Sequence, residues 1–158
     1  MGKRLRGMRV AILVVALGAA VLGTTPVEAG APVVIRLGHI GFPGSLFAVT
    51  ADEYAKRVNE ALKGKAEVKV FHSSQLGNDE QLMKGIKVGV VEMCLPSTIM
   101  STADPRYGVF EMPYLFRDRV HVKRVTQDAQ VKAALFDPLP AIGIRVVGMW
   151  ENGFRAIT

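Results

Sequence analysis

The stretch from Ala66 to Leu95 reads AEVKVFHSSQLGNDEQLMKGIKVGVVEMCL and carries, in this order, the signals of a strand, a helix and a second strand. Ala66–His72 alternates between apolar and polar residues, as a half-buried strand does. Asn78 or Asp79 can cap a helix that continues to about residue 87. Val90–Leu95 is a short apolar run before a proline, which is typical of a buried strand.

The sequence on both sides of this stretch repeats the alternation. Val33–His39 predicts a strand, and Ser45 can cap a helix that runs to about Leu62. After Leu95 we expect one or two helical turns, an apolar aromatic segment, two helices and a final strand, at Ser97–Ala103, Val109–Phe116, Arg119–Asp128, Val131–Phe136 and Ile144–Trp150. The repeated order predicts an α/β layer fold with a mainly parallel sheet.

The first 29 residues have the pattern of a secretory signal peptide. A basic segment with Lys3, Arg4, Arg6 and Arg9 precedes an apolar run from residue 10 to residue 23, and small residues follow. This run has 14 residues, whereas a spanning helix needs about 20. We therefore expect cleavage after Ala29, with residue 31 as the alternative point, and a mature protein in the periplasm. The competing interpretation is an uncleaved membrane anchor.

The positive charge of the chain belongs mostly to this leader. The whole chain has 20 basic and 14 acidic residues. The leader holds four of the basic residues and one acidic residue, so the mature part has 16 against 13, a net charge of +3. A charge this mild and scattered does not indicate nucleic acid or an anionic membrane as a partner. We also expect no stable membrane insertion after the leader is removed.

The sequence shows no motif typical of an enzyme. The histidines His39, His72 and His121 lack metal-ligand spacing, and the single cysteine, Cys94, is expected to pack as a small hydrophobe. Ser97 lacks the flanking glycines of a nucleophile elbow. We therefore expect no catalysis, no metal and no cofactor.

Polar residues gather instead at the predicted carboxyl ends of the strands, where open α/β sheets bind ligands. These residues are His39–Phe42, His72–Ser74, Ser97 with Thr98, and Glu151–Arg155. The guanidinium of Arg155 suits a carboxylate, and Trp150 can form an apolar wall beside it. The pattern predicts a site for a small organic acid. The plainer interpretation makes His72 a solvated strand end and Arg155 a surface charge.

Three segments resemble a known family in order and separation. The first is His72-Ser-Ser-Gln-Leu-Gly77 with its helix and Lys87-Val-Gly-Val-Val-Glu-Met93. The others are Phe110-Glu-Met-Pro-Tyr-Leu-Phe116 and Gly148-Met-Trp-Glu-Asn-Gly-Phe-Arg155. Together they are similar to the DctP-type solute receptors of tripartite ATP-independent periplasmic (TRAP) transporters, over about residues 33–158.

The resemblance implies a periplasmic binding protein fold of type II-like architecture, with two α/β lobes that close on a ligand around a hinge. Residues 30–150 would form the first lobe, and residues 151–158 would begin the crossing to the second. The chain is then expected to be the N-terminal portion of a longer receptor, with an incomplete first lobe and little affinity alone. Its partners would be a small organic acid and the membrane permease of a TRAP transporter.

The resemblance also assigns residues to the ligand site. Arg155 matches the first of two arginines near the ligand carboxylate, and Asn152 lies in the turn before it. Ser97 and His39 match positions where strands enter the cleft, although Ile40 is the alternative to His39. Tyr114 matches a loop that lines the cleft floor, while for Tyr114 and Trp150 the alternative is packing in the lobe core.

Two other functions stay open from the sequence. A receptor for an ABC importer would share the two-lobed architecture, although the segments around Tyr114 and Asn152 favour the TRAP type. A secreted hydrolase is the alternative from another class, and turnover of generic ester or phosphate substrates would distinguish it.

Overall fold

The computed structural model describes residues 31–154. The chain divides into two units, Met1–Gly30 and Ala31–Thr158, and the described residues lie in the second. The predicted signal peptide at residues 1–29 and the predicted ligand residue Arg155 both lie outside the described residues. Within the described part, no helix is long and apolar enough to cross a membrane.

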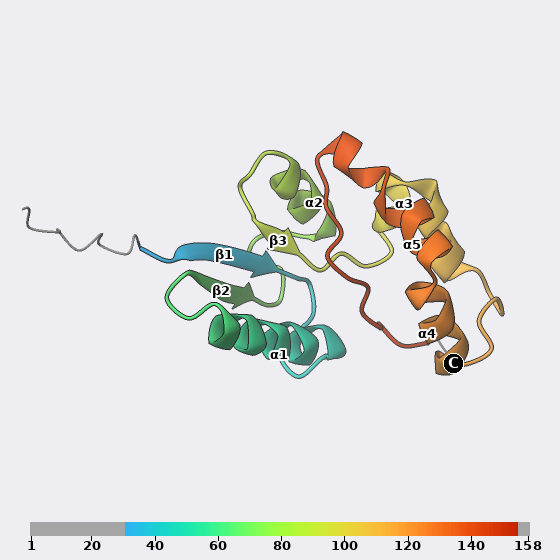
Figure 1. The fold of residues 1–158 in the computed structure, drawn as a ribbon, viewed down its shortest axis with the longest axis horizontal. Coiled ribbons are helices and arrows are strands. Elements are labelled where there is room, and N and C mark those ends of the chain that lie inside the picture. The colour runs from blue at the N-terminus through green and yellow to red at the C-terminus, as the bar shows by residue number, and fades with distance from the viewer. Residues whose placement is uncertain (1–30, 155–158) are drawn as a thin grey trace, which may run out of the picture. The chain divides into compact units, whose positions relative to one another are not determined.

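A parallel sheet of three strands forms the centre of this unit. The strands are β1 (Val33–Gly38), β2 (Ala66–Phe71) and β3 (Met93–Cys94), in the order β2-β1-β3. β1 pairs with β2 along its full length but with β3 at only two positions. Figure 1 shows β1 as the middle arrow. The predicted α/β fold with a mainly parallel sheet is therefore confirmed.

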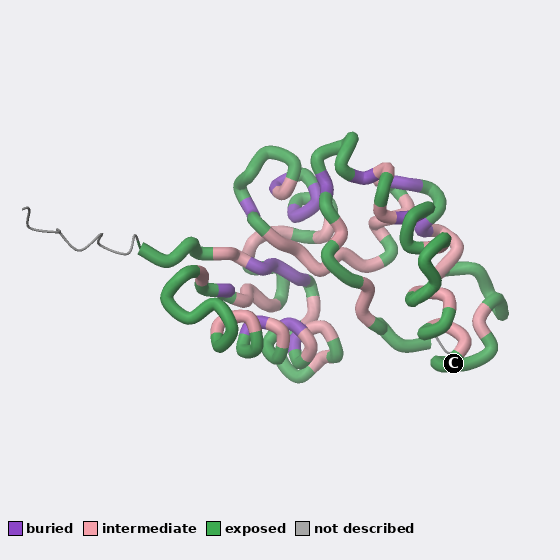
Figure 2. Tube along the Cα trace, in the orientation of Figure 1, coloured by how far each residue is buried: buried purple, intermediate pink, exposed green. Residues whose placement is uncertain are grey.

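Helix α1 (Leu46–Ala61) connects β1 to β2 and begins at the predicted cap, since the Ser45 side chain accepts a hydrogen bond from the amide of Ala48. Small residues on one face of the helix lie against the sheet. They form a buried cluster with the strand residues, made of Leu37, Ala51, Ala55 and Val68. We call these four residues the sheet cluster. Figure 2 shows this burial at the end of β1 and along α1.

Helix α2 (Asp79–Lys87) leads from β2 to β3 and begins with a capping box. The side chain of Asn78 accepts from the amide of Gln81, and the Gln81 side chain accepts from the amide of Asn78. This reciprocal pair satisfies two amides that a helix start leaves open. Leu82 and Met83 are buried on the face of this helix that packs inward.

The C-terminal half is made of short helices around a second core. They are α3 (Met100–Ala103), η1 (Pro105–Glu111), α4 (Arg119–Gln127), α5 (Ala129–Phe136) and η2 (Leu139–Ile142). A buried cluster joins them to α2 and consists of Met83, Tyr107, Leu135, Leu139 and Ile144, which we call the helical cluster. The Tyr107 hydroxyl donates to the carbonyl of Leu135 at 2.9 Å and so ties η1 to α5.

Two predicted strands differ from the structure. Ile144–Trp150, predicted as a strand, forms no strand, and the prediction for Val90–Leu95 is correct only at Met93 and Cys94. The side chains of the first segment pack against both clusters, with Ile144 buried and Trp150 against the sheet cluster. The apolar pattern there serves side-chain packing, which requires no ladder of backbone hydrogen bonds.

Candidate functional site

The loops after the three parallel strands meet at one edge of the sheet and are joined by backbone hydrogen bonds. The amide of Ser73 donates to the carbonyl of Gly41 at 2.9 Å, and the amide of Ser74 donates to that of His39 at 3.1 Å. After β3, the amide of Leu95 donates to the carbonyl of Gly38 at 3.0 Å. We call this region the strand-end edge. Its loops are fixed to one another rather than independent.

Two of the predicted site residues come together at this edge. The side-chain amide of Asn152 donates to the hydroxyl of Ser97 at 3.4 Å, although 55 positions separate them in the sequence. Ser97 is half-buried and Asn152 is exposed. Neither group is charged, and both can donate to or accept from a polar ligand. The structure thus brings the loop after β3 and the C-terminal segment to the same place.

Asp79 contacts the backbone of Ser97 and was not predicted as a site residue. Burial raises the pKa of Asp79, while a hydrogen bond from the backbone of Ser97 lowers it in part. One of its carboxyl oxygens, Oδ1, is buried without a hydrogen-bond partner within the described residues. The sequence indicated Asp79 only as a possible helix cap, because a contact with the next loop leaves no local pattern.

Cys94, beside this loop, behaves as a packing residue. Its Sγ lies 3.9 Å from Sδ of Met83, and the side chain packs against the helical cluster. Burial, with a smaller contribution from Asp79, raises the pKa of the thiol to about 12. The thiol is therefore protonated at neutral pH and is a poor nucleophile.

His39 is completely buried, and both of its ring nitrogens are engaged. Its Nδ1 accepts from the amide of Gly41 at 3.1 Å, and its Nε2 lies 3.0 Å from Nδ1 of His72. Nε2 of His72 lies 3.4 Å from a carboxyl oxygen of Asp52 on α1. Burial lowers the pKa of His39, His72 lowers it further, and Asp52 opposes both. Neither the pairing of the rings nor Asp52 was predicted.

The remaining predicted residues lie in different settings. The ring of Trp150 packs on that of Tyr54, with centroids 5.3 Å apart, and contacts the sheet cluster. Tyr114 has 93% of its surface exposed and a positive φ of 59°, so it does not pack in a core. Next to Asn152, the Glu151 carboxylate accepts from the Arg119 guanidinium at 2.5 Å.

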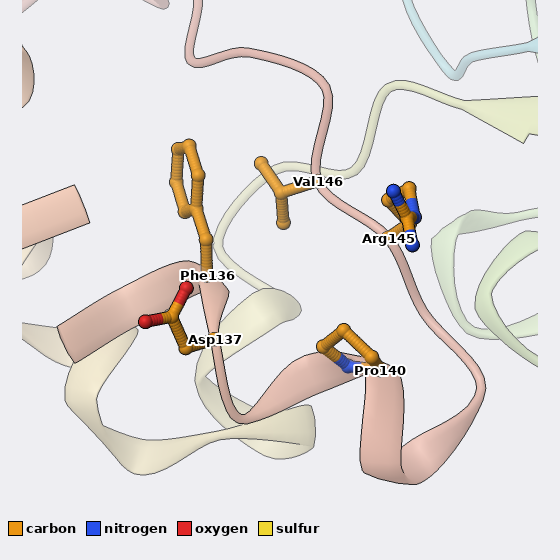
Figure 3. Close-up of a pocket in the computed structure, with 5 residues that line it drawn as sticks. All are labelled: Phe136, Asp137, Pro140, Arg145 and Val146. Atoms are coloured by element: carbon orange, nitrogen blue, oxygen red, sulfur yellow. The ribbon is translucent and has the colours of Figure 1, made fainter. Parts of the chain in front are cut away.

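One hollow on the described residues has a volume of about 380 Å³. It lies between the end of α5, η2 and the segment that follows (Figure 3), and its lining is Phe136, Asp137, Pro140, Arg145 and Val146. None of the predicted site residues lines it. Within residues 31–154, no three His, Cys, Asp or Glu side chains converge as possible metal ligands.

Comparison with protein families gives one clear match. Residues 37–158 match the model of bacterial extracellular solute-binding protein, family 7. The chain is 29% identical, over 131 residues, to the C4-dicarboxylate-binding periplasmic protein of Rhodobacter capsulatus, covering 80% of this chain and 38% of that protein. The chain therefore spans about two fifths of the length of the curated relatives it matches.

Solved structures agree with this match. The sugar acid binding protein of Advenella mimigardefordensis, in complex with galactonate, superposes with a TM-score of 0.73 at 34% identity, over 78% of this chain and 40% of that one. A TRAP periplasmic solute binding protein from Sulfurospirillum deleyianum with bound succinate gives 0.64 at 34% identity, over 70% and 36%. The predicted type II-like fold and the family resemblance are confirmed.

Proposed function

This chain belongs to family 7 of the bacterial extracellular solute-binding proteins, and from that membership we propose that it is a receptor for a small organic acid in the periplasm. The receptor would deliver its ligand to the membrane permease of a TRAP-type transporter. Members of the family bind solutes and do not transform them, so the proposal includes no covalent step. The similar proteins that hold galactonate and succinate support a carboxylate as the shared chemistry of the ligand.

The observation that carries the proposal is the meeting of Ser97 and Asn152 at the strand-end edge. Ligands of open α/β sheets bind beyond the carboxyl ends of the strands, and these two side chains lie there. In the proposed complex they would hydrogen-bond the polar groups of the acid. Arg155, three residues after Asn152, would pair with the carboxylate through its planar guanidinium.

The other site residues would support this contact. Trp150 would form an apolar wall from its position against Tyr54, and Tyr114 would approach the ligand from an exposed loop. His39 is buried, so its role would be to position the loops rather than to contact the acid. Residues 1–29 would direct export, residues 30–150 would form the first lobe, and residues 151–158 would begin the crossing.

Nuclear magnetic resonance of the full chain tests the proposal with matched ligands. Because an incomplete first lobe is expected to have little affinity, succinate and galactonate at high concentration should shift the Ser97 amide and the Asn152 side-chain amide only weakly, but in a saturable way. Their uncharged counterparts, succinamide and galactose, should leave both signals in place. Equal shifts with charged and uncharged compounds, or no shift at all, would contradict the proposal.

A substitution identifies the proposed charge partner. Arg155→Gln should weaken carboxylate binding by about tenfold or more, because a hydrogen bond to a charged group contributes about 1.5–3 kcal/mol. Arg145→Gln, an exposed arginine at the hollow near η2, is the matched control and should keep the affinity. If both substitutions weakened binding equally, Arg155 would not be the residue that pairs with the ligand carboxylate.

A further inference from the structure

A continuous chain of side chains connects the buried end of β1 to the surface of α1. It runs from the amide of Gly41 to His39, from His39 to His72, and from His72 to Asp52. His39 is inaccessible to solvent, the His72 side chain is 25% exposed, and that of Asp52 is 57% exposed. We call this chain the histidine relay. Its inner end is buried and its outer end reaches water.

The hydrogen bonds of the relay allow only one placement of protons when both rings are neutral. The amide of Gly41 donates to Nδ1 of His39, so that nitrogen carries no hydrogen. The His39 hydrogen is therefore on Nε2, where it donates to Nδ1 of His72. The His72 hydrogen must then be on Nε2, facing the carboxylate of Asp52.

An added proton cannot enter this arrangement without breaking a hydrogen bond. His72 is the ring that solvent reaches, since its side chain is 25% exposed whereas His39 is inaccessible. Doubly protonated His72 donates from both nitrogens, so Nε2 of His39 has to become an acceptor. The hydrogen of His39 then moves to Nδ1 and opposes the amide of Gly41, and these two donors cannot bond.

The Gly41 backbone has no room to absorb this change. A Cβ built on Gly41 would lie 2.6 Å from the hydroxyl of Ser45 and 2.7 Å from Cβ of Phe47. Gly41 therefore lies directly against the residue that caps α1 and against its first turn. Its carbonyl also accepts the amide of Ser73. Loss of the bond to His39 disturbs the loops after both β1 and β2.

We propose that His39 and His72 are positioning residues that hold the strand-end edge in its binding arrangement only while both rings are neutral, so that acid releases the loop at Gly41. This inference rests on the proposed function, because it assigns a control to that binding edge. The titratable groups that act on the His39 ring are His72, at the end of β2, and Asp52, on α1.

The lowered pKa of His39 agrees with an opening of the relay in acid. A histidine with a lowered pKa in the folded state stabilises that state above its ordinary pKa, about 6.5, and loses this contribution as the pH falls through the folded value. The relay is therefore intact at neutral pH. It opens on the acid side of the ordinary histidine range.

Nitrogen-15 spectra of the histidine rings in the unsubstituted full chain test the relay directly. At about pH 8, His39 and His72 should both carry hydrogen on Nε2. Between about pH 8 and about pH 5, hydrogen should move to Nδ1 of His39 and the exchange protection of the Gly41 amide should fall by about tenfold. The Val33 amide, bonded to Lys65 at the opposite end of the sheet, should keep its protection. Hydrogen on Nδ1 of His39 at neutral pH, or constant Gly41 protection, would overturn the inference.

A conservative substitution distinguishes an effect of protonating His72 from an effect of losing its hydrogen bond to His39. His72→Asn keeps an acceptor oxygen near the position of Nδ1 but cannot gain a proton. It should preserve the protection of Gly41 at about pH 8 and abolish its loss at about pH 5. His121→Asn, which changes the histidine of α4, is the control and should keep the full pH response. A pH response of Gly41 that persists unchanged in His72→Asn would refute the proposal.

Ligand titrations keep this inference distinct from the proposed function. Succinate should bind the unsubstituted chain at least about tenfold more weakly at pH 5 than at pH 8, and His72→Asn should remove that difference. If the ring hydrogens lie where predicted but the chain does not bind succinate, only the proposed function is contradicted. Binding with the same affinity at both values would contradict the positioning role of the histidines.

Discussion

Ser73 and Ser74 show how a strained turn is held at the strand-end edge. Both residues have positive φ, 51° and 61°, and the amide of Gln75 donates to the carbonyl of His72 across them. Two successive left-handed residues correspond to a type I′ turn, which glycine and asparagine form more easily than serine. The cross-loop bonds to His39 and Gly41 hold the turn in place.

Replacing one of these serines should therefore stabilise the protein. Ser73→Gly keeps the backbone amide that donates to Gly41 and removes the Cβ that disfavours positive φ. We expect the free energy of unfolding to rise by about 0.5–1 kcal/mol, measured by urea denaturation followed by circular dichroism. Ser101→Gly, in helix α3, should lower it by a similar amount. A loss of stability in Ser73→Gly would show that the turn is not strained.

The expectation that ligand residues gather at the carboxyl ends of the strands placed Ser97 and Asn152 together, but it did not predict the hydrogen bonds among the residues there. Ser97 and Asn152 were both predicted for the site, and the structure joins them. The bond between His39 and His72 was not predicted, because it depends on the register of β1 against β2. A pattern of single residues does not contain that register.

Among the elements, those with a cap in the sequence were predicted best. Ser45 and Asn78 begin α1 and α2 as expected, because side-chain oxygens at these positions satisfy open helix amides. Asp118 likewise caps α4. Two predicted strands, Val90–Leu95 and Ile144–Trp150, were predicted poorly, since the first pairs at only two positions and the second packs against two clusters without pairing. Whether a segment pairs as a strand depends on a free edge of the sheet lying beside it, and the local sequence does not specify this.

The tight contact between β1 and α2 predicts how a substitution between them changes stability. A Cβ on Gly38 would lie 2.6 Å from Cδ2 of Leu82, which is buried and has no open side to move to. Gly38→Ala should lower the free energy of unfolding by about 1–3 kcal/mol, through overpacking between strand and helix. The measurement is thermal or urea unfolding followed by circular dichroism.

Gly108→Ala is the matched control for this substitution. Its new Cβ would have only ordinary contact, with Cβ of Ser101 at 4.0 Å, and stability should change by about 0.5 kcal/mol or less. An equally stable Gly38→Ala variant would indicate that Leu82 repacks freely and that the strand and helix are not tightly matched.

In the described unit as a whole, the segment from Ile144 to Trp150 connects the two cores. Ile144 is buried in the helical cluster, and Trp150 at the other end lies against the sheet cluster. The segment therefore couples the stability of the sheet to that of the short helices, although it belongs to neither. It also carries Asn152 to the strand-end edge.

Truncating the buried end of this segment should cost more than truncating its exposed middle. Ile144→Ala should lower the free energy of unfolding by about 2–5 kcal/mol, because it leaves a cavity among packed side chains. Val147→Ala, at a position 68% exposed in the same segment, should change it by about 0.5 kcal/mol or less. Equal effects in urea denaturation would show that the segment does not couple the cores.

The packing of Trp150 on Tyr54 also has an optical consequence. Trp150 is the one tryptophan of the sequence, so ultraviolet emission from this chain originates at a single known place. That place contacts the sheet cluster and lies two residues before Asn152. We expect its apolar contacts to shift the emission to shorter wavelength, and Tyr54, whose ring centroid lies 5.3 Å away, to transfer excitation to it. The molecule thus carries an intrinsic fluorophore between its core and its proposed ligand contacts.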